Sequence, residues 1–242
     1  MGFLRSLAFN LYFYLWTTIA SLMGLPLLAF GWRRMNAYGR WWSGTILAGL
    51  RLLCGLDGKV AGLERLPAGA CIVAMKHQSA WDTLMAPQIL DAPAFVLKQE
   101  LIRIPFFGWY LRHCRMLPVD RKAGAKALKT LVRDAQARKA EGRPIVIYPE
   151  GTRRLPGAPP AYQPGVAALY QVLELPVVPV ALNSGLYWGR HRFAKRPGTI
   201  RLELLEPIPP GLSRRVFMAT LEERIEAATA RLIAEAERRP PA

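Results

Sequence analysis

The sequence predicts an α/β protein with a mixed, largely buried sheet flanked by helices, preceded by a hydrophobic helical segment. Three observations support this prediction. Short apolar runs alternate with helical patterns beyond residue 57, hydrophobic residues make up 52% of the 242 residues, and the first 56 residues contain no Asp or Glu. A chain of this length and hydrophobicity can bury a core without disulfides or metal ions, and it is too hydrophobic to be mostly disordered.

Residues 1–56 are expected to attach the protein to a membrane, ahead of a domain over residues 57–242. Residues 6–32 are 27 consecutive uncharged residues, rich in Leu, Phe, Tyr and Trp. As one helix they would span about 40 Å, against about 30 Å of bilayer hydrocarbon. Gly24 and Pro26 could instead kink the helix and make it re-enter. Crossing the membrane and lying in one leaflet therefore both stay open.

A second apolar stretch, residues 41–56, fits an interfacial helix with Trp41 and Trp42 at the level of the lipid headgroups. A cleaved signal peptide and a core helix of a soluble protein are the alternatives for the N-terminus. Arg33 and Arg34 directly after the first stretch disfavour export. Arginine on this flank places the main domain on the cytoplasmic side of the inner membrane.

Beyond residue 57, apolar runs predict strands at residues 70–75, 94–97, 116–119, 144–148, 177–182 and 200–205. Helical patterns occupy residues 79–90, 122–139 and 165–173. Ser213 could cap a final helix whose apolar stripe begins at Phe217 and serves packing. This alternation of strands and helices is typical of an α/β domain.

Charge and cysteine content limit the partners and the chemistry. The formal net charge is +16, which favours an anionic partner: nucleic acid, an acidic membrane surface or a phosphorylated substrate. Cys54, Cys71 and Cys114 have no metal-ligand spacing, so we expect reduced thiols and no zinc site.

Residues 76–83, K-H-Q-S-A-W-D-T, follow a predicted strand and open a helix, a common position for active sites in α/β proteins. The turn could bring the Asp82 carboxylate to one imidazole nitrogen of His77. The other nitrogen would then be free to act as a general base. The competing interpretation is a capping box formed by Ser79 and Asp82 at the start of the helix.

Residues 145–154, I-V-I-Y-P-E-G-T-R-R, also lead from a β-branched run into a polar turn. Gly151 allows the backbone to approach a ligand closely, and Thr152 and the arginines offer hydrogen bonds and charge for a phosphate. The alternative is an ordinary charged surface turn. The sequence contains neither a Walker loop nor a G-x-S-x-G elbow.

Together these runs resemble the phospholipid and glycerolipid acyltransferase family, which includes the 1-acylglycerol-3-phosphate acyltransferases. The family is marked by H-x-x-x-x-D and by F/Y-P-E-G-T-R, which match His77…Asp82 and residues 148–153. Further family motifs resemble residues 96–101 with 104–109, residues 119–121 and residues 177–183. The resemblance runs from about residue 57 to about residue 206. Lys76 stands where many members have Asn, and Arg154 stands where Ser or Asn is common.

The resemblance implies a role for each matching residue. His77 would deprotonate the acceptor hydroxyl, and Asp82 would orient His77, so that the oxygen attacks an acyl thioester directly. The acceptor's phosphate would be bound by three cations and shaped by three neighbouring residues: Lys98, Arg121 and Arg153, with Glu150, Gly151 and Thr152. Lys98 and Arg121 could instead be plain surface charges. No metal and no organic cofactor is implied.

The function so implied is the transfer of a fatty acyl group from acyl-CoA or acyl carrier protein to 1-acylglycerol-3-phosphate (lysophosphatidic acid). The product would be phosphatidic acid for phospholipid biosynthesis; lyso-ornithine lipid or another lysophospholipid is the alternative acceptor. Lys122, Lys126, Lys129 and Arg133 recur at helical spacing and form a basic face for an anionic membrane or acyl donor, or a simply solvated face.

Two other classes of protein are alternatives to the interpretation as an enzyme. A membrane-tethered nucleic-acid-binding protein would explain the net charge, but the sequence has no RNP pattern, finger or recognition helix, so we expect no nucleic acid partner. A non-catalytic lipid-binding relative is disfavoured by the presence of both His77 and Asp82.

Overall fold

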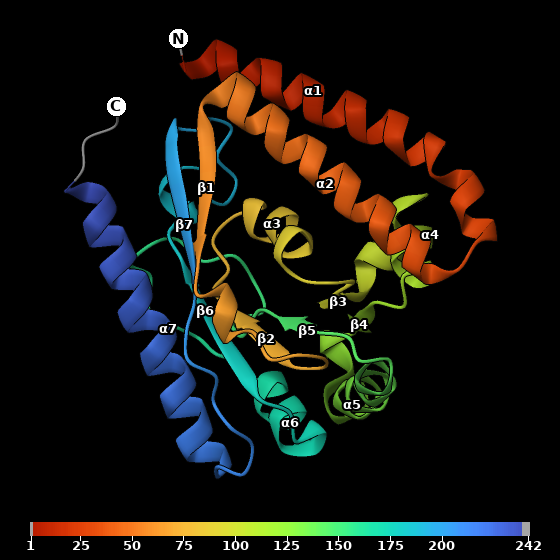
Figure 1. Cartoon of the computed structure of the whole chain (residues 1–242), viewed down its shortest axis with the longest axis vertical. Helices are drawn as coiled ribbons and strands as arrows, with labels where there is room; N and C mark the ends of the chain where they lie inside the picture. The colour runs from red at the N-terminus through yellow and green to blue at the C-terminus, as the bar shows by residue number, and fades with distance from the viewer. Residues whose placement is uncertain (1, 239–242) are drawn as a thin grey trace.

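The computed structural model of the chain describes residues 2–238 and confirms the α/β prediction. Helix α1 (Gly2–Met23) ends at Gly24, and a short 3-10 turn, η1 (Leu25–Ala29), leads back into α2 (Trp32–Cys54). The two helices lie side by side as a hairpin across one end of the molecule (Figure 1). The apolar stretch therefore folds back on itself. Among the described helices, none combines the length and the apolar character needed to cross a bilayer.

In the described residues, seven strands form one sheet in the order β1-β7-β6-β2-β5-β3-β4. The strands are β1 (Leu56–Ala61), β2 (Ile72–Met75), β3 (Ala94–Lys98), β4 (Leu117–Val119), β5 (Ile145–Ile147), β6 (Val177–Leu182) and β7 (Gly198–Leu204). The β6–β7 pair is antiparallel and the other neighbouring pairs are parallel, so the sheet is mixed. Because β6, β2, β5 and β3 are adjacent and parallel, their carboxyl ends meet at one edge.

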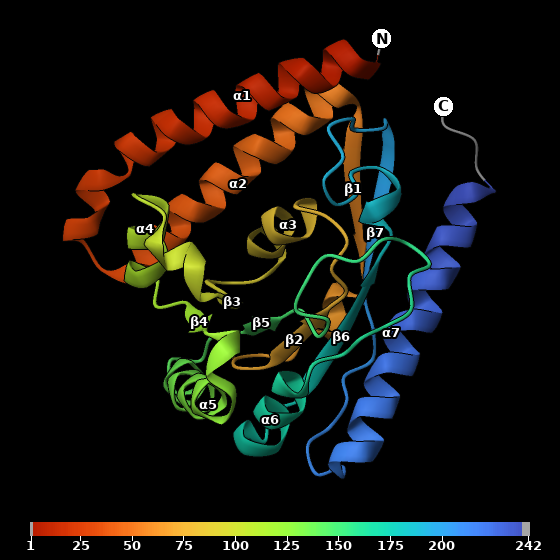
Figure 2. The ribbon, with the colours of Figure 1, turned by 180° about the vertical axis from the view of Figure 1, so that it is seen from behind.

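Helices cover both faces of the sheet (Figures 1 and 2). One face packs against α1, α2 and α3, and the other packs against α5, α6 and α7. The remaining helices are α3 (Trp81–Ile89), α4 (Phe107–His113), α5 (Gly124–Ala140), α6 (Pro164–Leu173) and α7 (Arg214–Glu237). The short 3-10 turns are η2 (Leu63–Arg65), η3 (Gln99–Arg103), η4 (Arg121–Ala123) and η5 (Ser184–Leu186). Ser213 caps α7 as expected, accepting a hydrogen bond from the amide of Val216.

The expected interfacial position of residues 41–56 is corrected by the packing of α2. Ile46 and Leu50 are fully buried in the core beneath α1, and Trp42 packs partly buried against the same core. Trp41 remains exposed. An amphipathic helix of this kind stabilises itself by burying its apolar face in the protein core, with α1 lying over it.

Helix α1 is tied to a distant loop near the end of the sheet. The ammonium of Lys195 lies 5.3 Å from the ring centre of Phe9 and 5.1 Å from that of Trp188, and its backbone amide donates to Ser6 Oγ at 3.0 Å. These cation–π contacts and the hydrogen bond fix one end of the hairpin.

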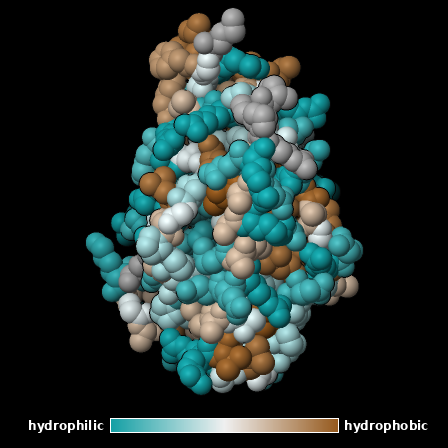
Figure 3. All heavy atoms as spheres, turned by 90° about the vertical axis from the view of Figure 1, so that its left-hand side faces the viewer, coloured by the Kyte–Doolittle hydropathy of each residue, from teal (hydrophilic) through white to brown (hydrophobic). Residues whose placement is uncertain are grey.

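Seen from the side that carries α7, hydrophilic side chains cover most of the surface, and hydrophobic atoms gather at the top where α1 begins (Figure 3).

Candidate active site

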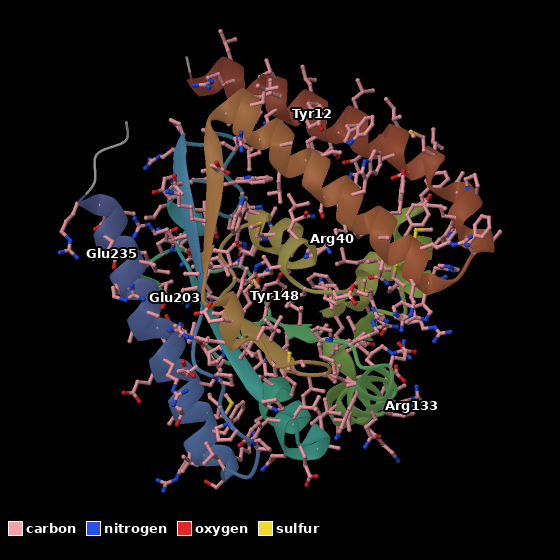
Figure 4. All side chains as sticks on the ribbon, in the orientation of Figure 1. Tyr12, Arg40, Arg133, Tyr148, Glu203 and Glu235 are labelled. Carbon is pink, nitrogen blue, oxygen red and sulfur yellow. The ribbon has the colours of Figure 1, made fainter. Side chains whose placement is uncertain are left out.

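Polar residues follow the carboxyl ends of three neighbouring strands. His77 is the second residue after β2, Tyr148 the first after β5 and Ser184 the second after β6, while Lys98 ends β3. Since these strands are parallel neighbours, the residues gather at one edge of the sheet, where ligands bind in open α/β sheets. Tyr148 lies in the interior between α3 and the strands, whereas Arg133 of α5 points away from the body (Figure 4).

The turn into α3 brings His77 and Asp82 together. His77 Nδ1 lies 3.0 Å from Asp82 Oδ2, and the carboxylate is fully buried while the imidazole is 13% exposed. In the tautomer with its proton on Nδ1, the ring donates to Asp82 and leaves Nε2 as an acceptor. Asp82 Oδ2 also accepts from the amides of Gln78 and Ser79, each at 2.8 Å. The same carboxylate thus holds the turn before α3 and orients the histidine. Ser79 Oγ accepts from the amide of Trp81 at 3.1 Å, but the N-cap residue of α3 is Ala80, so the predicted capping box forms only in part.

A stacked ring and a tight loop form the other wall of the site. The rings of His77 and Tyr148 are stacked, with centroids 4.0 Å apart. Gly151 has φ +64°, a left-handed conformation that a side chain would strain. The amide of Arg154 donates to the carbonyl of His77 at 2.8 Å, which joins the loop after β5 to the loop after β2. Burial raises the pKa of the Tyr148 hydroxyl well above its ordinary value, so it stays protonated.

His77 lines a cavity of about 1020 Å³ that runs between the sheet edge and the helical hairpin. Its apolar wall comes from α2, α3, β3, α4 and α5, and includes Leu84, Phe95, Leu111 and Leu128. Its far end reaches Ala20 of α1. The cavity therefore places His77 and the loop after β5 beside many apolar side chains, and its volume suits a ligand with an extended hydrocarbon part.

The residues proposed for phosphate binding differ in their placement. Lys98, Gly151, Thr152 and Arg153 all line the cavity. Lys98 is 55% exposed and pairs at 3.2 Å with Glu100, which is a weak surface interaction. The backbone of Arg121 lies in η4, but its side chain is outside the described part of the structure.

Glu150 differs from its neighbours, because it does not line the cavity. Its side chain is buried, and Oε1 accepts from the ammonium of Lys76 at 3.0 Å. Burial raises the pKa of the Glu150 carboxyl, and Lys76 opposes that rise. The Glu150 carboxylate therefore supports the loop after β5 from the protein interior and does not shape the phosphate site directly.

Two further site residues escaped the sequence motifs. Ser184 is fully buried and donates to Asp82 Oδ1 at 2.6 Å, and Gln78 Oε1 accepts from the amide of Gly185 at 3.0 Å. Both contacts join the loop after β2 to the loop after β6. More than 100 residues separate the partners in each contact, so no local spacing could have indicated them.

Within residues 2–238, no group of three or more His, Cys, Asp or Glu side chains is placed to hold a metal ion. Cys54, Cys71 and Cys114 are buried free thiols. The arrangement at the sheet edge offers a base, an acid that orients it, and a basic loop.

Comparison with known proteins agrees with this geometry. The family model described as acyltransferase matches residues 58–183. The 1-acyl-sn-glycerol-3-phosphate acyltransferase of Pseudomonas aeruginosa is 32% identical over 92% of this chain and 86% of its own length. The enzyme of the same name from Saccharomyces cerevisiae is 31% identical over 66% of this chain and 54% of its own length.

Among solved structures, the crystal structure of the 1-acyl-sn-glycerophosphate acyltransferase PlsC from Thermotoga maritima is similar, with a TM-score of 0.78. The alignment covers 96% of this chain and 98% of that chain, at 23% identity. At this level of identity the similarity establishes the shared fold.

Proposed function

The chain belongs to the acyltransferase family, and we propose that it transfers a fatty acyl group from an acyl thioester to the free hydroxyl of 1-acyl-sn-glycerol-3-phosphate. The product is phosphatidic acid, for phospholipid biosynthesis. The observation that carries this proposal is the His77–Asp82 pair, whose histidine lines a large cavity with many apolar side chains. The names of the relatives from P. aeruginosa and S. cerevisiae support the same acceptor.

In the proposed mechanism, Nε2 of His77 removes the proton from the acceptor hydroxyl while Asp82 holds the ring and balances its developing charge. The oxygen attacks the thioester carbonyl, and the tetrahedral intermediate collapses with loss of the thiolate. The protonated imidazole then returns its proton to the thiolate, so a thiol leaves. A positioned base of this kind contributes about 10²–10⁴ in rate.

The phosphate of the acceptor is proposed to bind at the loop after β5. Arg153 and Thr152 line the cavity there, with Lys98 at the end of the neighbouring strand. A guanidinium can bind two phosphate oxygens at once, and an ammonium adds a point charge. Arg121 remains a candidate for the same phosphate from its position in η4.

A membrane surface is the proposed source of the acceptor. Helix α1 carries an exposed apolar stripe at helical spacing: Phe3, Leu7, Leu11, Tyr14, Leu15 and Leu22. Such a face inserts into the boundary between headgroups and acyl chains. Arg33 and Arg34 lie beside the hairpin turn and favour the cytoplasmic side of the inner membrane.

The acyl donor is proposed to be acyl-CoA or an acyl carrier protein, both of which are anionic. Lys126, Lys129 and Arg133 are exposed on α5, and Lys122 is exposed in η4 just before it. The early part of α5 borders the cavity. In Figure 1, α5 lies at the opposite end of the molecule from α1. This placement leaves the basic face free for a water-soluble donor while α1 contacts the membrane.

The test is acyl transfer by the detergent-purified protein from radiolabelled acyl-CoA or acyl carrier protein. The wild type should transfer label to lysophosphatidic acid. His77→Asn, which keeps a hydrogen-bonding side chain but no base, should lose at least about 10²-fold in rate. His191→Asn, an exposed histidine away from the cavity, is the matched control and should keep full activity.

The acceptor series decides the substrate. Label that enters only lyso-ornithine lipid or another lysophospholipid would replace the acceptor and keep the mechanism. Full activity of His77→Asn would refute the proposed base.

A further inference from the structure

A buried ionic cluster lies behind the site, and the mechanism above does not use it. The ammonium of Lys76 lies 3.0 Å from Glu150 Oε1, and 2.7 and 2.9 Å from the two oxygens of Glu226. The hydroxyl of Tyr162 donates to Glu226 Oε1 at 3.0 Å. The Lys76 side chain is only 3% exposed. We refer to Lys76, Glu150, Glu226 and Tyr162 as the Lys76 cluster.

The four members of the Lys76 cluster come from four different segments. Lys76 lies between β2 and His77, and Glu150 lies between β5 and Gly151. Tyr162 precedes α6, and Glu226 is in the middle of α7. None of these four side chains lines the cavity. The cluster therefore connects the segments that carry the site to a helix that covers the opposite face of the sheet.

Glu150 depends on Lys76 for its position. Its Oε1 accepts from the lysine, while its Oε2 is buried with no hydrogen-bond partner among the described residues. A buried charge with a single strong contact is held by that contact, and it is costly if the contact is lost. Since Gly151, Thr152 and Arg153 follow directly, the position of Glu150 determines where this loop meets the cavity.

Lys76 is held in turn by Glu226. One carboxylate would be enough to balance the charge of the lysine, yet the ammonium contacts both oxygens of a second one. Glu226 is fixed by the Tyr162 hydroxyl and by the packing of α7, whose neighbour Ile225 is fully buried. The chain of contacts thus runs from a rigid helix through Lys76 to the loop.

We propose that Lys76 is a positioning residue, anchored by Glu226 and Tyr162, that holds Glu150 and so places the loop of Thr152 and Arg153 for phosphate binding. This proposal rests on the proposed function for its kinetic test only. The geometry assigns Lys76 no contact with substrate. It acts through the loop after β5, and its effect should appear mainly in acceptor binding.

The first test compares Glu226→Gln with Glu223→Gln. Glu226→Gln keeps the shape and the Tyr162 contact but removes the charge, and Glu223 is exposed on the same helix without a contact to the cluster. Glu226→Gln should raise the acceptor KM about fivefold, with kcat and the donor KM within about twofold of wild type. Glu223→Gln should match wild type. An unchanged acceptor KM, or an equal change in kcat and both KM values, would overturn the proposal.

The second test needs no substrate. The double variant Lys76→Gln/Glu150→Gln removes both fully buried charges together. The Glu226 carboxylate, which is 26% exposed and keeps its hydrogen bond from Tyr162, stays charged and partly solvated, so the protein should fold. Amide hydrogen exchange of residues 150–154 should become about tenfold faster than in wild type, while exchange in β6 stays unchanged. Unchanged exchange at residues 150–154, or equal acceleration in β6, would overturn the proposal.

The two tests separate the two proposals. If the wild type acylates no lysophosphatidic acid, the proposed function fails, and the exchange experiment still decides whether Lys76 positions the loop.

Discussion

Replacing Ser184 by Ala would test whether the His77–Asp82 pair depends on support from the neighbouring strand. Asp82 Oδ2 accepts three hydrogen bonds, from His77 Nδ1 and two amides. Among residues 2–238, Asp82 Oδ1 accepts a side-chain hydrogen bond from Ser184 alone, at 2.6 Å. Both residues are fully buried. Ser184→Ala therefore leaves one oxygen of a buried carboxylate without its donor.

The expected magnitude follows from the charge of the acceptor. A hydrogen bond to a charged group contributes about 1.5–3 kcal/mol, so the free energy of unfolding should fall by about 2 kcal/mol. The carboxylate also loses the side-chain contact that fixes Oδ1, so its orientation toward His77 Nδ1 is held by Oδ2 alone. We expect kcat/KM to fall about tenfold, which corresponds to about 1.4 kcal/mol of lost transition-state stabilisation.

The assay is acyl transfer to lysophosphatidic acid, with the free energy of unfolding measured by denaturant titration. Ser213→Ala is the matched control, because loss of this cap on α7 costs about 1 kcal/mol of stability far from Asp82. It should leave kcat/KM unchanged. The reasoning is refuted if Ser184→Ala keeps more than half of wild-type kcat/KM, or if Ser213→Ala loses as much activity.

Three further substitutions probe the stacked ring, a buried thiol and a close backbone approach. Tyr148→Phe keeps the ring stacked on His77 and removes a buried hydroxyl that has no partner in the described structure, so stability and activity should hold or rise slightly. Tyr148→Ala removes the ring and should lower the free energy of unfolding by about 3–5 kcal/mol. Denaturant titration and the transfer assay test both expectations. Burial raises the pKa of the Cys71 thiol from 9.0 to about 11, so the unfolded state loses the thiol proton first as the pH rises. The free energy of unfolding should therefore fall between pH 9 and 11, by up to about 3 kcal/mol. Cys71→Ala should flatten this part of the pH–stability curve, and a curve identical to that of the wild type would contradict the assignment. A Cβ on Gly108 would lie 2.1 Å from the carbonyl oxygen of Ile102, so Gly108→Ala should destabilise by about 1–3 kcal/mol, while Gly39→Ala, with nothing within 4 Å, should not lower the melting temperature.

Among the six strands that the sequence predicts, β2, β5 and β6 are the ones buried on both faces. Val177–Leu182 and Ile145–Ile147 are apolar runs in which every residue is buried. A continuous apolar run is the sequence pattern typical of parallel strands covered on both faces. β1 escaped prediction because Asp57, Gly58 and Lys59 interrupt its sequence, Leu-Asp-Gly-Lys-Val-Ala, so that it contains no continuous apolar run. It lies at the edge of the sheet and forms through pairing with β7, a partner far along the chain. Likewise, α4 is only seven residues long and has no clear apolar period.

The candidate site shows the same division between local and distant contacts. His77 and Asp82 are five residues apart, so one turn brings them together and their spacing predicts the pair. Motif residues 150–153 were expected to share one pocket, yet Glu150 is turned into the protein toward Lys76. The sequence did not reveal this, because the direction of a loop side chain depends on partners such as Glu226, 150 residues from Lys76.

The attachment of α1 to Lys195, together with the pairing of β1 with β7, sets the order in which the protein can be completed on the ribosome. The hairpin and β1 emerge first, but β7 follows β1 by about 140 residues, and Lys195 follows Ser6 by 189. At roughly 5–20 residues per second, the apolar faces of both helices wait at least about 7–28 s for the segments that cover or anchor them. Under the proposed membrane attachment, a bilayer beside the ribosome takes up the hairpin during this interval, and synthesis without one leaves these faces open to aggregation.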